Sequence, residues 1–175
     1  MVNVIAKEIE RSREANPPQI PLETVKLWMA GEATDTMGAT YAFVTDPICI
    51  ARVVPPIPQI DATSFLRRYF AYCLAEDPKS EWADSRYSAS WDIANMLRAL
   101  AADSARQDEV RDWIAWVKDQ YLKGAAPMRQ AIETGVVEHI LAEPSLRGLL
   151  NDWGADSALR EAIQRSERHV RRLPG

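Results

Sequence analysis

The sequence predicts a mostly α-helical fold of the α+β class, an antiparallel helical bundle with one β-hairpin near residues 40–54. Along most of the chain, apolar residues recur three and four positions apart, which is the spacing of an amphipathic helix. Two short runs between residues 40 and 54 are instead rich in β-branched and aromatic side chains, which is typical of strands. Prolines and glycines stand mostly between these segments, where they act as breakers.

The length of 175 residues predicts a single domain over residues 1–175. We expect three parts within it: a helical pair at residues 1–31, the hairpin at 40–54, and a helical bundle at 61–172. The bundle would supply most of the core, because an isolated hairpin is only marginally stable.

Two helices are predicted before the hairpin. The first covers residues 1–15 and ends at Pro17 and Pro18, since proline cannot continue the hydrogen-bond ladder. The second covers residues 21–30 and ends at Gly31. The hairpin would pair residues 40–45 with 48–54 across Asp46-Pro47, and Cys49 would lie on its second strand.

The remainder is predicted to be helical, with Asp61 and Asp156 as N-caps of two of the helices. The intervening segments are residues 62–75, a long helix from Trp82 or Arg86 to residue 102, then 108–123, 126–142 and 144–153. The helix at 108–123 should be central to the bundle because one face carries Val110, Trp113, Ile114, Val117 and Tyr121.

The net charge of −4 is unevenly distributed. Residues 76–159 hold nine basic and fifteen acidic side chains, whereas residues 160–175 hold five basic and two acidic ones. An acidic body argues against a nucleic-acid binder, because phosphate contacts need clustered Lys and Arg. Favourable interaction with the dipole of the last helix explains the C-terminal cations better than a phosphate-binding tail does. These cations are Arg160, Arg165, Arg168, His169, Arg171 and Arg172.

No apolar run is long enough to span a bilayer, and the first residues do not form a signal peptide. We therefore expect a soluble cytoplasmic protein without membrane association. Cys49 and Cys73 are expected to be buried free thiols.

Known catalytic signatures are missing from the sequence. No catalytic residue, metal ligand or cofactor is predicted, since His139 and His169 would need several carboxylates to form a metal site. The sequence leaves open whether any catalysis exists, although it favours a protein that is not an enzyme.

Two groups of side chains are candidate binding residues. The first group is acidic and lies at the start of the long helix; it comprises Asp77, Glu81, Trp82 and Asp84. The second has residue types common in pockets and interfaces, and comprises Arg86, Tyr87, Trp91 and Asn95. A solvated helix face is the simpler explanation for Asp84, Ser88, Asp92 and Asn95, which lie close together on a helical wheel.

The segments from Ala131 to Leu141 and from Leu149 to Leu159 contain a Gly-x-x-Glu helix followed by a Trp-x-x-Asp-x-x-Leu helix start. In this the C-terminal part resembles small bacterial domains of unknown function, some of which are suspected of being immunity proteins encoded beside toxins. The resemblance covers about 30 residues and assigns no catalytic residue.

These observations lead to two functional hypotheses. The first is an intracellular protein-binding module, of the immunity-type inhibitor kind, whose acidic middle segment steers a basic partner. The alternative is an enzyme or sensor with a small-molecule pocket near Arg86, Tyr87, Trp91 and Asn95. The sequence does not identify the partner or the ligand, and it does not determine whether the protein forms homo-oligomers.

Overall fold

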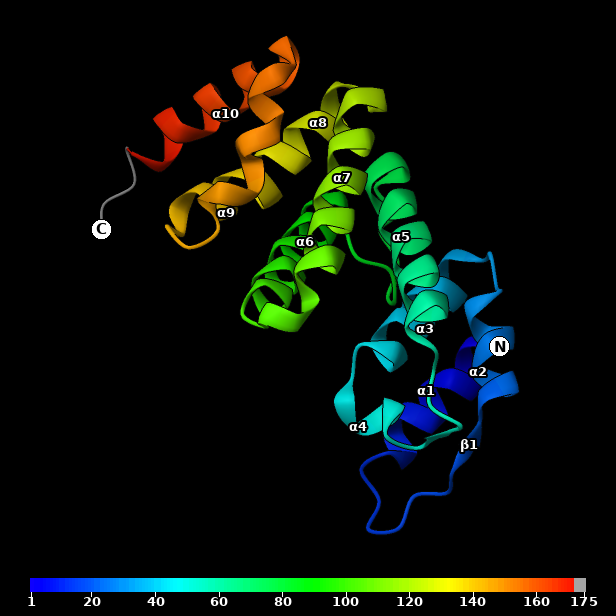
Figure 1. Cartoon of the computed structure of the whole chain (residues 1–175). Coiled ribbons are helices and arrows are strands. Elements are labelled where there is room, and N and C mark those ends of the chain that lie inside the picture. Colours follow the sequence, from blue (N-terminus) through cyan, green and yellow to red (C-terminus); the bar gives the residue numbers. More distant parts are fainter. Residues whose placement is uncertain (172–175) are drawn as a thin grey trace. The chain divides into compact units, whose positions relative to one another are not determined.

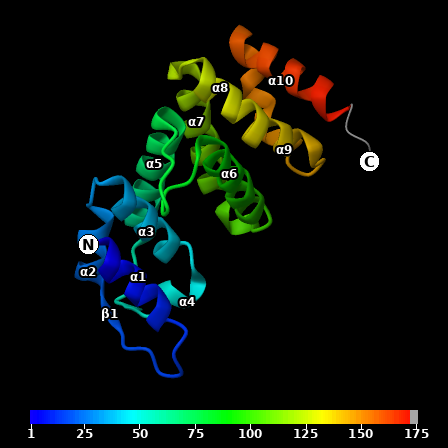
Figure 2. The same cartoon turned by 180° about the vertical axis from the view of Figure 1, so that it is seen from behind.

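A computed structural model describes residues 1–171 and is mostly helical, which confirms the predicted fold class. Its contacts divide the chain into two compact units (Figures 1 and 2). Unit 1 comprises residues 1–73 and 77–84, and unit 2 comprises residues 74–76 and 85–175. That the chain folds as one domain stays a prediction. Among the described helices, none combines the length and the apolar character needed to cross a membrane.

Unit 1 consists of helices and a pair of two-residue strands. Its elements are α1 (Val2–Arg11), β1 (Ile20–Pro21), α2 (Leu22–Met29), α3 (Thr34–Val44), α4 (Pro47–Ile50), β2 (Val53–Val54) and most of α5 (Gln59–Glu76). The predicted first helix is therefore real but ends at Arg11. The predicted N-cap role of Asp61 is wrong: α5 begins at Gln59 after Pro58, so Asp61 lies in the first turn of the helix.

The predicted β-hairpin near residues 40–54 is wrong. Residues 34–44 form α3, and Asp46 caps α4 by accepting hydrogen bonds from the backbone N–H groups of Ile48 and Cys49. The strands that do exist are parallel, with Ile20 opposite Val53 and Pro21 opposite Val54. Proline after an acidic cap is a helix-start signal, and the strand interpretation overlooked it.

Tertiary packing explains why a β-branched segment becomes helical. A Cβ on Gly38 would lie 2.0 Å from the carbonyl oxygen of Trp82. Only a glycine at this position therefore allows α3 to approach that backbone so closely. The hydroxyl of Thr40 donates to the Thr36 carbonyl at 2.7 Å, so this buried hydroxyl has a hydrogen-bond partner within the helix. Burial of the α3 face thus outweighs the β propensity of its residues.

Aromatic rings fill the interior of unit 1. Trp28 and Phe43 meet edge to face at 5.1 Å between centroids, and Tyr41 stacks on Tyr69 at 4.4 Å. Cys49 and Cys73 are buried free cysteines, as predicted, although Cys49 lies on α4 and not on a strand.

Unit 2 is an assembly of helices packed on one another. Its elements are α6 (Arg86–Ala101), η1 (Ser104–Arg106), α7 (Gln107–Lys123), α8 (Ala126–Ile132), η2 (Glu133–Val137), α9 (Glu138–Ala142), η3 (Arg147–Ala155) and α10 (Ser157–Val170). All five predicted core residues of α7 are buried. Asp156 caps α10 as predicted, through the backbone N–H groups of Ala158 and Leu159.

One predicted helix of unit 2 is interrupted. Residues 126–142 are helical throughout, but residues 133–137 form the π-helical turn η2 between α8 and α9. A π turn inserts an extra residue into the helix and is often found at functional sites. Here it changes which side chains of this helix face α6.

Several of the C-terminal cations bind other residues of the protein. Arg165 donates to both carboxylate oxygens of Glu133, at 2.8 and 3.0 Å, and Arg160 donates to the carbonyl of Gly154. Arg171 pairs with Glu167 at 3.5 Å. Arg172, the last member of the predicted set, lies outside the described residues.

Candidate functional site

Helix α6 carries two exposed aromatic side chains one turn apart. Ser85 caps this helix by accepting from the backbone N–H of Ser88 at 3.2 Å, and that cap fixes where the helix begins. Tyr87 and Trp91 follow, with 46% and 57% of their surface exposed. Burial of large aromatic side chains is strongly favourable in free energy, so an exposed pair on one helix face indicates a functional surface.

These two side chains line a groove of about 380 Å³ in unit 2. We call it the aromatic groove; its residues are Tyr87, Ser88, Trp91, Thr134, Gly135, Glu138, His139, Ala142 and Val170. They come from α6, η2, α9 and the end of α10. The volume lies in the range of small-molecule sites.

The ring of Trp91 is held in place by His139. The indole N–H of Trp91 donates to Nε2 of His139, and the two rings meet edge to face with 5.2 Å between centroids. His139 Nε2 is thus an acceptor, so the neutral imidazole carries its proton on Nδ1. Burial, together with the charge of Arg98, lowers the pKa of His139 and favours this neutral form.

The π turn brings the floor of the groove against α6. Gly135 is buried, and a Cβ at this position would lie 2.3 Å from the Cβ of Ser90. The backbone of η2 can therefore pack directly on α6. This packing places Thr134 and Glu138 on the same groove as Trp91.

Glu138 is the one acidic side chain of the groove. Burial raises its pKa; His169, whose Nε2 lies 3.7 Å from a carboxylate oxygen, opposes this shift, and the charge of Glu133 adds to it. A raised pKa favours the protonated carboxyl, which can donate as well as accept a hydrogen bond. Thr134 adds an exposed hydroxyl.

The other two predicted pocket residues do not line the groove. Arg86 donates from Nε to the carbonyl of Leu74 at 2.5 Å and from Nη2 to that of Ala75 at 3.0 Å, so it binds the last turn of α5. Asn95 is exposed and accepts from Arg98 at 2.8 Å. Their roles in the structure are those of a C-terminal helix cap and a surface hydrogen bond.

The acidic group predicted as a partner surface belongs to unit 1. Asp77 ends α5 in the left-handed conformation with φ 51°. Asp84 accepts from the hydroxyl of Tyr69 at 3.1 Å, and its backbone N–H donates to the same hydroxyl at 2.9 Å. Glu81 is exposed, and Trp82 is half-buried. The hydrogen bonds between Asp84 and Tyr69 give Asp84 a structural role within unit 1.

Sequence reasoning did not select the second wall of the groove, which consists of Thr134, Glu138 and His139. Gly135 and Glu138 are the Gly-x-x-Glu pair of the resemblance, and the adjacent Glu138 and His139 were considered as metal ligands and rejected. The available signal was the combination of a small residue inside a helix with polar neighbours, since such a glycine usually has a packing reason.

The donor set of the groove is poor in metal ligands and in reactive groups. No cluster of three His, Cys, Asp or Glu side chains within residues 1–171 is arranged to hold a metal ion. Because Nε2 of His139 already accepts from Trp91, this nitrogen is not available to take a proton from a substrate. This hydrogen bond argues against His139 Nε2 as a general base.

No protein-family model, curated protein or solved structure matches this chain. The resemblance of the C-terminal part to small bacterial domains stays a prediction.

Proposed function

We propose that this protein is a binding protein or sensor that takes a small, flat, largely apolar molecule with a polar edge into the aromatic groove. The observation that carries the proposal is the immobilised Trp91 ring, which is exposed although its indole N–H is already bonded to His139. A ring held rigid before binding loses little conformational entropy when a ligand stacks on it.

The lining of the groove determines the ligand chemistry. Tyr87 and Trp91 offer ring faces, and Ala142 and Val170 add aliphatic surface. Aromatic ligands pack against such rings in offset or edge-to-face arrangements. Thr134 and Glu138 supply a hydrogen-bond donor and an acceptor at the edge, which favours a ligand with an N–H or O–H group in the ring plane.

A titration with two probes of similar size tests this proposal. Indole is flat and carries an N–H group, whereas cyclohexanol is neither flat nor aromatic. We expect indole to shift the indole resonance of Trp91 in ¹H–¹⁵N spectra, and cyclohexanol to bind at least tenfold more weakly. Equal binding of both probes, or shifts away from the groove, would contradict the proposal.

A matched pair of variants completes the test. Trp91→Ala should weaken indole binding at least about fivefold, because stacking on one ring is worth about 1–3 kcal/mol in comparable sites. Leu122→Ala is the control, since Leu122 is a large exposed side chain of α7 outside the groove. The control should bind indole as the unchanged protein does.

The second candidate function is a protein-binding module of the immunity-type inhibitor kind with a basic partner. The exposed Glu81 in the loop between α5 and α6 favours it, because charges there remain accessible for steering. Glu81→Lys should slow association with a basic partner and reduce its salt dependence. Asp84 should be left unchanged, since its bond to Tyr69 would confuse folding with binding.

Candidate partners are the products of neighbouring genes and proteins recovered in a pull-down. If such a partner binds the Glu81→Lys variant equally well at low salt, the acidic-surface hypothesis is wrong. If a flat aromatic compound raises the melting temperature and no partner is recovered, the aromatic groove is the functional site.

A further inference from the structure

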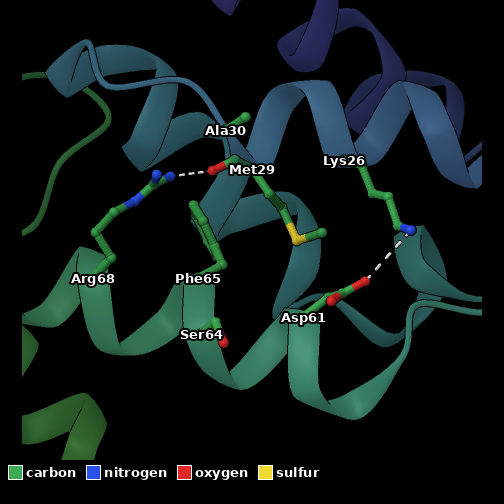
Figure 3. A pocket seen from close by; sticks show the side chains of 7 residues that line it. All are labelled: Lys26, Met29, Ala30, Asp61, Ser64, Phe65 and Arg68. Carbon is green, nitrogen blue, oxygen red and sulfur yellow. Dashed lines mark hydrogen bonds and ion pairs between the residues drawn. The ribbon is translucent and has the colours of Figure 1, made fainter.

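Unit 1 contains a second groove, formed by α2 and α5 on residues that the aromatic groove does not use (Figure 3). Its volume is about 420 Å³, and its residues are Lys26, Met29, Ala30, Asp61, Ser64, Phe65 and Arg68. On α5 these residues recur at spacings of three and four, so they lie on one face of the helix. We call this the α2–α5 groove.

Two cations from different helices stand at opposite ends of the α2–α5 groove. Figure 3 shows Arg68 reaching towards the carbonyl of Met29 at one end and Lys26 pointing towards Asp61 at the other. Arg68 binds that carbonyl and the one of Gly31, the latter at 3.2 Å, and both bonds come from Nη2. Its Nε and Nη1 groups make no hydrogen bond to any described residue, which leaves donors free at this end.

The ammonium group of Lys26 is also incompletely bonded. It lies 3.7 Å from Asp61 Oδ2 and 3.7 Å from Glu23 Oε1, which are ion-pair distances longer than a hydrogen bond. Glu23 has 82% of its side chain exposed, so this second pairing is weak. Ser64 is exposed between the two ends and adds a hydroxyl donor.

The floor between the two cations is apolar. Met29 and Phe65 are only 7% and 4% exposed, and the Arg68 guanidinium lies 5.8 Å from the centre of the Phe65 ring. Among the lining residues the cations outnumber the single carboxylate of Asp61, in a chain whose net charge is −4. A site with more donors than acceptors on an acidic protein favours an anion by local charge complementarity.

We propose that the α2–α5 groove binds a small organic oxyanion, a carboxylate or a phosphate monoester, that carries an apolar group. The oxyanion takes donors from Lys26 and Ser64, the apolar group lies against Met29 and Phe65, and the remaining donors of Arg68 lie at the opposite end of the groove. Asp61 keeps the Lys26 ammonium oriented towards the groove and excludes ligands with a second anionic group at that end. This site is independent of the proposed function.

Four probes separate the parts of this proposal at constant ionic strength. Benzoate and phenyl phosphate carry both features, benzyl alcohol lacks the charge, and inorganic phosphate lacks the apolar group. We expect at least one of the first two to bind at least tenfold more tightly than either incomplete probe, and to shift the amide resonances of residues 64–68. If benzyl alcohol binds as tightly as benzoate and phenyl phosphate, the oxyanion site is refuted, and if inorganic phosphate does so, the apolar floor is refuted.

Variants of residues that are not buried keep the test independent of folding. Lys26→Gln should weaken binding of the tighter probe at least fivefold, and Ser64→Ala should weaken it about twofold to fivefold. Lys79→Gln is the matched control, because Lys79 is an exposed cation of unit 1 outside the α2–α5 groove. Equal binding by the Lys26 and Lys79 variants would overturn the proposal.

Discussion

Arg52 and Glu8, 44 positions apart in the chain, form an ion pair of 2.6 Å with only 5% and 14% of their side chains exposed. Arg52 also donates to the Glu8 carbonyl and to the Ser12 hydroxyl, both at 2.6 Å, and to the Pro18 carbonyl at 2.9 Å. One guanidinium therefore connects α1, the loop after it and the start of β2. The fold of unit 1 depends on this contact because removal of one partner leaves the other charged and buried.

Acidification should destabilise unit 1 through Glu8. Burial alone would raise the pKa of this carboxyl, but the hydrogen bonds from Arg52 and Arg11 outweigh it and lower the pKa. An ordinary Glu titrates near pH 4.3, at about the value of the unfolded chain. The stabilisation is therefore complete above about pH 4.3 and is lost as the pH falls through the lower folded value.

Urea unfolding between pH 7 and pH 2.5 measures this effect. Glu8→Gln should unfold at lower urea at pH 7 and should lose less stability on acidification than the unchanged protein. Arg52→Ala should cost about 3–5 kcal/mol at pH 7, as the breaking of buried ion pairs does. An equal acid response of the Glu8→Gln variant and the unchanged protein would refute the assignment.

Truncation of Trp113 should be among the most costly changes in unit 2. This side chain is 1% exposed at the centre of α7 and meets the ring of Trp116 edge to face at 5.4 Å. Trp113→Ala should lower the free energy of unfolding by about 3–5 kcal/mol, measured by chemical denaturation. A loss below about 1 kcal/mol would show that α7 is rotated relative to the structure.

Gly38→Ala should destabilise unit 1 by about 1–3 kcal/mol through overpacking. The new methyl group would meet the carbonyl oxygen of Trp82 at 2.0 Å and the Ala83 nitrogen at 2.7 Å, and both are backbone atoms that cannot rotate away. Gly154→Ala is the control because nothing lies within 4 Å of its added Cβ. Similar melting temperatures for the two variants would contradict the close approach of α3.

The imidazole of His139 should titrate below the ordinary value of about 6.5. Burial and the charge of Arg98 both lower its pKa, since each disfavours the protonated ring. An NMR titration of the imidazole carbon-bound protons measures the value directly. Arg98→Gln should raise the pKa of His139, because it removes a nearby cation and releases the carboxylate of Glu143 that Arg98 binds at 2.6 Å. A midpoint at or above 6.5 in the unchanged protein would contradict the environment of Trp91 and His139.

The sequence by itself determined those features of the helices whose residue pattern is unambiguous. The five buried residues of α7 and the Asp156 cap of α10 are local features, because each depends on residues three or four positions apart. Tyr87 and Trp91 were selected because their residue types are common in pockets and interfaces, and both residues do line the aromatic groove. Helical spacing is sufficient to predict the buried face of α7 and the cap of α10, because neither depends on distant segments.

Tertiary structure decided the remainder. Residues 40–45 have the composition of a strand, yet the close approach of Gly38 to the backbone of Trp82 stabilises α3 there, and no local pattern shows this contact. The second wall of the aromatic groove is set by a π turn that places His139 beside Trp91, 48 positions away in the chain. Long-range packing selects one of several locally acceptable conformations, because burial at such contacts outweighs local propensities that are worth about 1 kcal/mol or less per residue.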